Sequence, residues 1–163
     1  MIELSKNFNP NYVAKIVKID KLKEIEGANT IQLAIIDFNP VIVSKNVKLG
    51  DVMVFFPVES RLSDDVLASL NLYSDKSRNL DTTKGGFFEK NGRVRAVKMM
   101  KGSVQSFGFL YPLNELFEAF GEKIYDVNNF VGQEFDTILG VKIVEKYERP
   151  QKESKVGSGQ KNP

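Results

Sequence analysis

The chain has 163 residues, of which 42% are hydrophobic and 27% charged, a composition typical of a folded globular domain. It contains no cysteine and no histidine, which excludes disulfides, thiol nucleophiles, imidazole bases and Cys/His zinc sites. The formal net charge is only +2, so a polyanionic partner has to be argued from local clusters of cations.

The sequence shows no segment typical of a membrane protein. No apolar run approaches the roughly 20 residues of a membrane-spanning helix, and the first residues lack the basic and apolar regions of a signal peptide. We therefore expect a cytoplasmic protein without a membrane partner.

The first third of the chain predicts a series of short strands. Residues 1–11 are polar and rich in asparagine, so we expect a flexible lead-in. Segments rich in Val and Ile then predict strands at residues 12–22, 31–37, 41–44 and 52–56. Periodicity alone leaves a helix open for the first of these segments, and Asn39-Pro40 predicts the bend between the second and the third. Closely spaced strands with tight turns indicate a small barrel or sandwich, so the predicted class is mainly β.

One or two short helices are expected among the strands. Ser63 is followed by two acids, which predicts a helix that begins there, because serine caps the first turn and acids favour its positive end. A second helix is predicted by the apolar spacing of residues 113, 116, 117 and 120, and Gly121 predicts its end.

The remaining segments are predicted from their composition. The polar insertion at residues 74–86 predicts a mobile loop, and residues 131–140 a further helical turn. Residues 141–147 predict a last strand, and the polar residues 151–163 a linker or tail.

The clearest charge asymmetry lies in the middle of the chain. Val94, Ala96 and Val97 alternate with cations, which predicts a strand that buries one face and presents charge on the other. Glu89 is the single acid between residues 84 and 101. Protection of a sheet edge is one explanation for this excess of charge, and contact with nucleic-acid phosphates is the one we favour. The candidate nucleic-acid contacts are Lys84, Lys90, Arg93, Arg95, Lys98 and Lys101.

Asn91-Gly92 predicts a type I′ hairpin between residues 87–90 and 93–95. Phe87 and Phe88 have the chemistry to stack on unpaired bases, but adjacent strand residues face opposite ways, so at least one is expected in the core. The Asn-Gly pair also invites comparison with the K-x-D-G pattern of nucleotidyltransferases. Glu89 stands where that lysine would be, so we assign no catalytic, cofactor-binding or metal-binding residue.

Five segments, in order, resemble the Deinococcus-type ATP-dependent RNA ligases. They are Glu26–Ile31, Val47–Pro57, Gly92–Gly102, Ser106–Leu113, and Leu139–Lys142 leading to Lys146–Pro150. The resemblance covers residues 12–150 and implies the OB-like N-terminal domain of such a ligase. It implies a domain that holds RNA or a nicked duplex while a following nucleotidyltransferase domain joins a 5′-phosphate to a 3′-hydroxyl.

The resemblance implies ATP and a divalent metal for the parent ligase and a nucleotidyltransferase domain in cis as partner. The chain contains no K-x-D-G lysine, so we expect no cofactor in these residues and no ligase activity from the chain alone. The alternative is a stand-alone OB-like module without catalytic activity, which docks a protein through the helix around Leu116 and Phe120 or through a strand edge.

Overall fold

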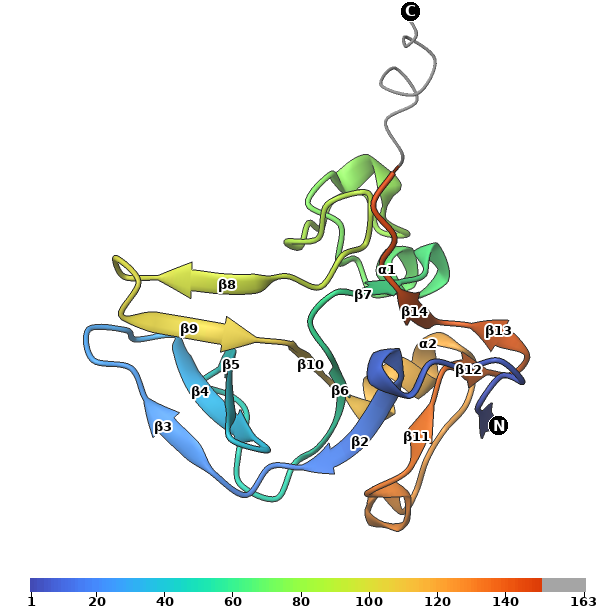
Figure 1. Ribbon diagram of the computed structural model, residues 1–163, viewed down its shortest axis with the longest axis horizontal. Coiled ribbons are helices and arrows are strands. Elements are labelled where there is room, and N and C mark those ends of the chain that lie inside the picture. Colours follow the sequence, from blue (N-terminus) through green and yellow to red (C-terminus); the bar gives the residue numbers. More distant parts are fainter. Residues whose placement is uncertain (151–163) are drawn as a thin grey trace, which may run out of the picture.

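Short antiparallel strands are the main secondary structure of the molecule, a computed structural model that describes residues 1–150 (Figure 1). The predicted linker or tail at 151–163 lies outside the described residues. The first strands are β1 (Ile2–Glu3), β2 (Ala14–Lys18), β3 (Leu22–Glu24), β4 (Ile31–Ile36), β5 (Asn39–Ser44), β6 (Val52–Phe56) and β7 (Ser60–Leu62). The later strands are β8 (Ala96–Met99), β9 (Val104–Phe107), β10 (Phe109–Pro112), β11 (Glu134–Phe135), β12 (Thr137–Ile138), β13 (Val141–Lys142) and β14 (Val144–Lys146).

The strands form small sheets in which every pairing between named strands is antiparallel. The largest has the order β10-β6-β2-β11, and three-stranded sheets have the orders β3-β4-β5 and β1-β12-β13. Two further pairs join β14 to β7 and β8 to β9. The predicted mainly β class is confirmed. Backbone pairing within residues 1–150 does not close the strands into a single barrel, so the OB-like form stays a prediction.

Two apolar clusters hold these sheets together. The smaller lies among β2, β4, β5, β6 and β10 and includes Ala34, Val41, Met53 and Leu110. The larger joins the helices to the C-terminal strands and includes Phe117 and other fully buried side chains. Every second residue of β4 is buried, so one face of this strand packs on the smaller cluster.

The hairpin between β4 and β5 turns two residues earlier than predicted. Asp37 and Phe38 form the turn with φ of 48° and 72°, and the strands pair up to Ile36 opposite Asn39. A two-residue turn with positive φ at both positions matches the twist of the strands. Asn39 and Pro40 therefore belong to β5, and the predicted bend at this dipeptide is wrong.

Both predicted helices are present. In α1 (Asp64–Ser69) the Ser63 hydroxyl accepts a hydrogen bond from the Val66 amide at 3.4 Å. In α2 (Leu113–Ala119) the apolar face is buried, and Gly121 follows with φ of 80°. No helix within residues 1–150 is long and apolar enough to cross a membrane.

Other segments differ from their predictions. The helical turn expected at 131–140 lies earlier, at the 3-10 turn Val127–Phe130, because β11 and β12 occupy residues 134–138. The lead-in at residues 1–11 contains β1, which pairs with β12. Two further 3-10 turns lie at Pro10–Tyr12 and Lys76–Arg78.

Asp136 connects the N-terminal segment to the rest of the protein through hydrogen bonds. Its carboxylate accepts hydrogen bonds from the Ser5 amide at 2.8 Å, from the Ser5 hydroxyl and from the Thr137 hydroxyl. Burial alone would raise the pKa of Asp136, but these hydrogen bonds outweigh it and hold the pKa below its usual value of 3.8. The carboxylate therefore stabilises the fold above that pH, and this contribution is lost as the pH falls through the lowered pKa.

Ser5→Ala removes the hydroxyl that stabilises the Asp136 carboxylate. We expect it to lower the free energy of unfolding by about 1.5–3 kcal/mol at pH 7, the range for a hydrogen bond to a charged group. Denaturant titration measures the loss, and the difference from the parent chain should shrink as the pH falls below 3.8. Ser74→Ala, at an exposed serine, is the control and should change little. A loss that is the same at pH 3 and pH 7 would contradict the role of the carboxylate.

Candidate nucleic-acid interface

The predicted hairpin at Asn91-Gly92 is wrong, because its two arms pair with other parts of the chain. On one side, Phe88 forms a parallel bridge with Tyr73. On the other, the Leu62 amide donates to the Gly92 carbonyl at 2.9 Å, and the Val94 amide donates to the Ser60 carbonyl at 2.8 Å. Gly92 is needed here, because a Cβ on it would lie 2.5 Å from the Leu62 carbonyl oxygen.

The basic strand begins later than predicted and belongs to the hairpin of β8 and β9. Its turn contains Met100, Lys101 and Gly102, all with positive φ. Every residue of β8 is exposed, so the predicted burial of one face, with Ala96 and Val97 in it, is wrong. The reason is that, among residues 1–150, β8 pairs with β9 alone and extends from the body of the molecule (Figure 1).

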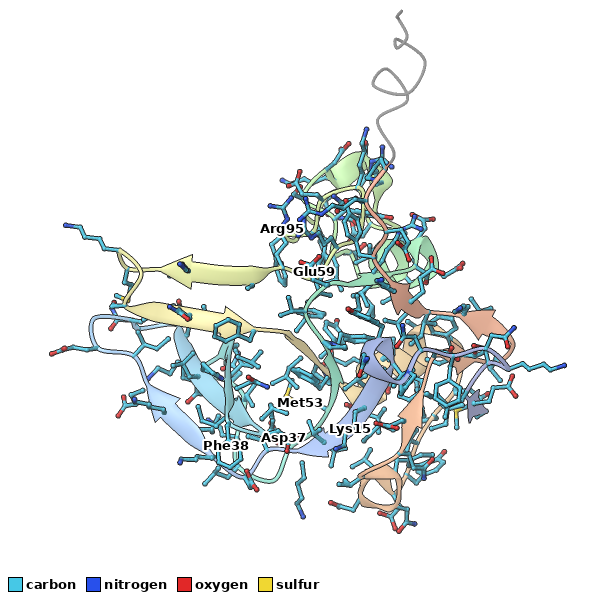
Figure 2. All side chains as sticks on the ribbon, viewed as in Figure 1. Lys15, Asp37, Phe38, Met53, Glu59 and Arg95 are labelled. Carbon is cyan, nitrogen blue, oxygen red and sulfur yellow. The ribbon has the colours of Figure 1, made fainter. Side chains whose placement is uncertain are left out.

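The structure separates the six predicted contacts. Arg95 lies at the start of the hairpin, as Figure 2 shows, with Lys98 in β8 and Lys101 in the turn. All three are exposed, and within residues 1–150 none of them forms an ion pair. Lys90 is exposed before the start of the hairpin, and Lys84 lies in the 74–86 insertion, 4.0 Å from Asp81.

Arg93 binds within the protein. Its Nε and one terminal nitrogen donate to Glu59 Oε2 at 3.1 and 2.8 Å, and its guanidinium lies 4.9 Å from the ring centre of Tyr147. The hydrogen bond to Glu59 raises the pKa of Arg93 and keeps it charged. Backbone bonds join the same segments, from the Glu59 amide to Val94 and from the Tyr147 amide to Glu59. Arg93 thus connects three distant segments of the chain.

An open groove of about 1130 Å³ lies beneath the hairpin. Val97 and Met99 of β8 line it together with Arg95 directly before the strand, which is the alternation expected for one face of an extended segment. Lys98 is not among the lining residues and belongs to the opposite face. Ile42 of β5 and Phe87 also line the groove. The groove was not predicted from the sequence. The apolar residues that alternate with cations in β8 could have indicated it.

Tyr111 and Glu115 also line the groove and interact with each other. Burial raises the pKa of Tyr111 to about 12, with a further contribution from the charge and hydrogen bond of Glu115. The phenol therefore stays protonated at neutral pH. Within the described part of the chain no cluster of acids is placed to hold a metal ion.

The 74–86 insertion, predicted as a mobile loop, is organised by one buried side chain. Asn79 is 5% exposed; its Oδ1 accepts from the Tyr73 amide at 3.1 Å. Its Nδ2 donates to the carbonyls of Tyr73 and Lys84 at 3.0 and 2.7 Å. These bonds satisfy the amide and fix the insertion beside the segment that carries Phe87.

Comparison with known proteins identifies similar folds. No protein-family model and no curated protein matches the chain. A solved Naegleria gruberi RNA ligase mutant with ATP and Mn is 22% identical with a TM-score of 0.54, over 93% of this chain and 38% of that chain. A mutant with AMP and Mn and an apo mutant are each 22% identical with a TM-score of 0.53, over 84% of this chain and 35% of theirs.

These similarities show the fold, which is RNA ligase-like. The chain spans 35–38% of the length of these ligase structures.

The two neighbouring arginines are expected to differ in their effect on stability. Arg93→Ala removes the contacts with Glu59 and Tyr147, so the thermal midpoint should fall by a few degrees. Arg93→Lys should not restore it, because lysine lacks the guanidinium fork that gives Glu59 two donors. Arg95→Ala is the matched control and should leave the midpoint nearly unchanged, since Arg95 is exposed. Equal midpoints for the two alanine variants would contradict the structural role of Arg93.

Proposed function

We propose that the chain is a nucleic-acid-binding accessory domain of an ATP-dependent RNA ligase of the Deinococcus type. It would hold RNA or a nicked duplex while a nucleotidyltransferase domain in cis seals a 5′-phosphate to a 3′-hydroxyl. The observation that supports this most is the exposed hairpin beside an open groove, with Arg95, Lys98 and Lys101 unpaired within residues 1–150. The RNA ligase-like fold supports it as well.

The contacts proposed here are fewer than those predicted from the sequence. The residues Arg95, Lys98 and Lys101 form the main set, because they lie together on the hairpin and have no acid partner within residues 1–150, and such cations gain most from a phosphate. Lys84 and Lys90 remain proposed secondary contacts. Arg93 is left out, because Glu59 already takes two of its donors.

The sealing reaction is assigned to another part of the parent protein. The chain has no K-x-D-G lysine, and no acid cluster in residues 1–150 is placed to hold a metal ion. ATP and a divalent metal are therefore proposed for the parent ligase and not for these residues. The domain boundary at residues 12–150 and the cytoplasmic location belong to the same proposal.

The second candidate function is that of a stand-alone module that binds a protein. The apolar residues of the groove favour it. The helix predicted to serve in that role is not free to do so, because Leu116 is fully buried and Phe120 packs against the larger cluster. Two surfaces remain for this candidate: the groove, and the edge of β8 that no strand within the described residues pairs with.

Binding of the full chain to single-stranded RNA at increasing salt tests the proposal. We expect the logarithm of the affinity to fall linearly with the logarithm of the salt concentration, by about 0.7 for each phosphate neutralised. The triple variant Arg95→Ala, Lys98→Ala, Lys101→Ala should bind more weakly, and its slope should be smaller by up to about 2.

The matched control is Lys18→Ala, Lys21→Ala, Lys23→Ala, which removes the same charge from exposed positions in and between β2 and β3, away from β8 (Figure 1). It should keep most of the affinity. Binding that does not depend on salt, or an equal loss in both triple variants, would refute the hairpin as the binding surface.

A further inference from the structure

Phe87 is the exposed end of a row of aromatic rings on the wall of the groove. Its side chain is 65% exposed, whereas Phe88 is 4% exposed. The ring centre of Phe87 lies 5.0 Å from that of Phe88 and 5.4 Å from that of Phe109, which contacts Tyr111 in turn. The outward face of Phe87 is therefore backed by rings that hold it in place.

Backbone hydrogen bonds on both sides of Phe87 hold the segment that carries it. The Gly86 amide donates to the Tyr73 carbonyl at 2.8 Å, and the Phe88 amide donates to the Leu72 carbonyl at 2.9 Å. Gly86 permits this contact, since a Cβ on it would lie 2.5 Å from the Leu72 carbonyl oxygen. Phe88 is buried, and its neighbour Phe87 is exposed and lines the groove.

The same groove carries a cation without a partner. Arg95 lines it and is exposed, and no carboxylate within residues 1–150 forms an ion pair with it. Glu89 and Glu115 also line the groove, but the interaction of Glu115 is with Tyr111. An exposed aromatic face and an unpaired guanidinium on one groove are the two groups that bind single-stranded nucleic acid.

We infer that the groove binds a single-stranded segment of RNA, with one unpaired base stacked on Phe87 and a neighbouring phosphate at Arg95. This inference rests on the proposed function and specifies the form of RNA that the domain recognises. A base inside a duplex is covered on both faces by its neighbours, so it has no face left for Phe87. An apolar protein surface over the groove would bury Arg95 without a partner, which is unfavourable, whereas a phosphate supplies that partner.

The test compares Phe87→Ala with the parent chain, using a short single-stranded RNA that carries one fluorescent adenine analogue. We expect the affinity to fall by about 5- to 150-fold, the equivalent of losing one stacked base. The fluorescence change on binding should be reduced, and the salt slope should stay the same because no charge is removed. Phe87→Trp keeps an aromatic face and should retain the affinity.

Phe38→Ala is the matched control. Phe38 is 97% exposed in the turn between β4 and β5, on the side of the molecule away from Arg95 (Figure 2). It should bind RNA like the parent chain. The same measurements on a blunt duplex should show no effect of Phe87→Ala.

The outcomes separate this inference from the function on which it rests. If Phe87→Ala binds single-stranded RNA as tightly as the parent while the hairpin triple variant does not, the stacking site is overturned and the proposed function stands. If Phe87→Ala weakens duplex and single strand equally, the preference for single strands is overturned. If the parent chain binds no RNA at all, the proposed function fails and the inference fails with it.

Discussion

The ion pair between Arg93 and Glu59 determines where the basic segment leaves the body of the protein. It joins the end of β6 and the start of β7 to residues 93–94, and Tyr147 packs on the same guanidinium. With Val94 buried directly after it, the chain up to this point is held in the core. Everything beyond, from Arg95 to Lys101, extends outward as a hairpin. One arginine therefore anchors the segment so that the following cations remain exposed.

This arrangement gives the molecule a surface with two chemistries. The face of β8 that lines the groove carries Val97 and Met99 beside Arg95, and Phe87 lines the same groove. Apolar and aromatic groups bind the bases of a nucleic acid, and cations bind its phosphates. The fold is shared with solved RNA ligase structures.

Much of the fold follows from local sequence, because local contacts decide it. The apolar run at 52–56 is β6, Ser63 caps α1, and the helical spacing after residue 113 gives α2. The failures are places where distant contacts outweigh local preference. Asn91-Gly92 favours a hairpin, but residues 60–62 pair with the segment that follows it. Likewise the partner of Arg93 lies 34 positions away in the sequence. The local excess of cations therefore located the basic region, but it did not show which cation forms an ion pair within the protein.

The most direct test of this account is an amide chemical-shift map of the isotope-labelled full chain during titration with single-stranded RNA. We expect the largest changes in residues 86–88 and in the hairpin formed by β8 and β9. The turn at Asp37 and Phe38, away from the hairpin in Figure 2, should change little. Changes centred on β2 and β3 with none in the hairpin would contradict the account.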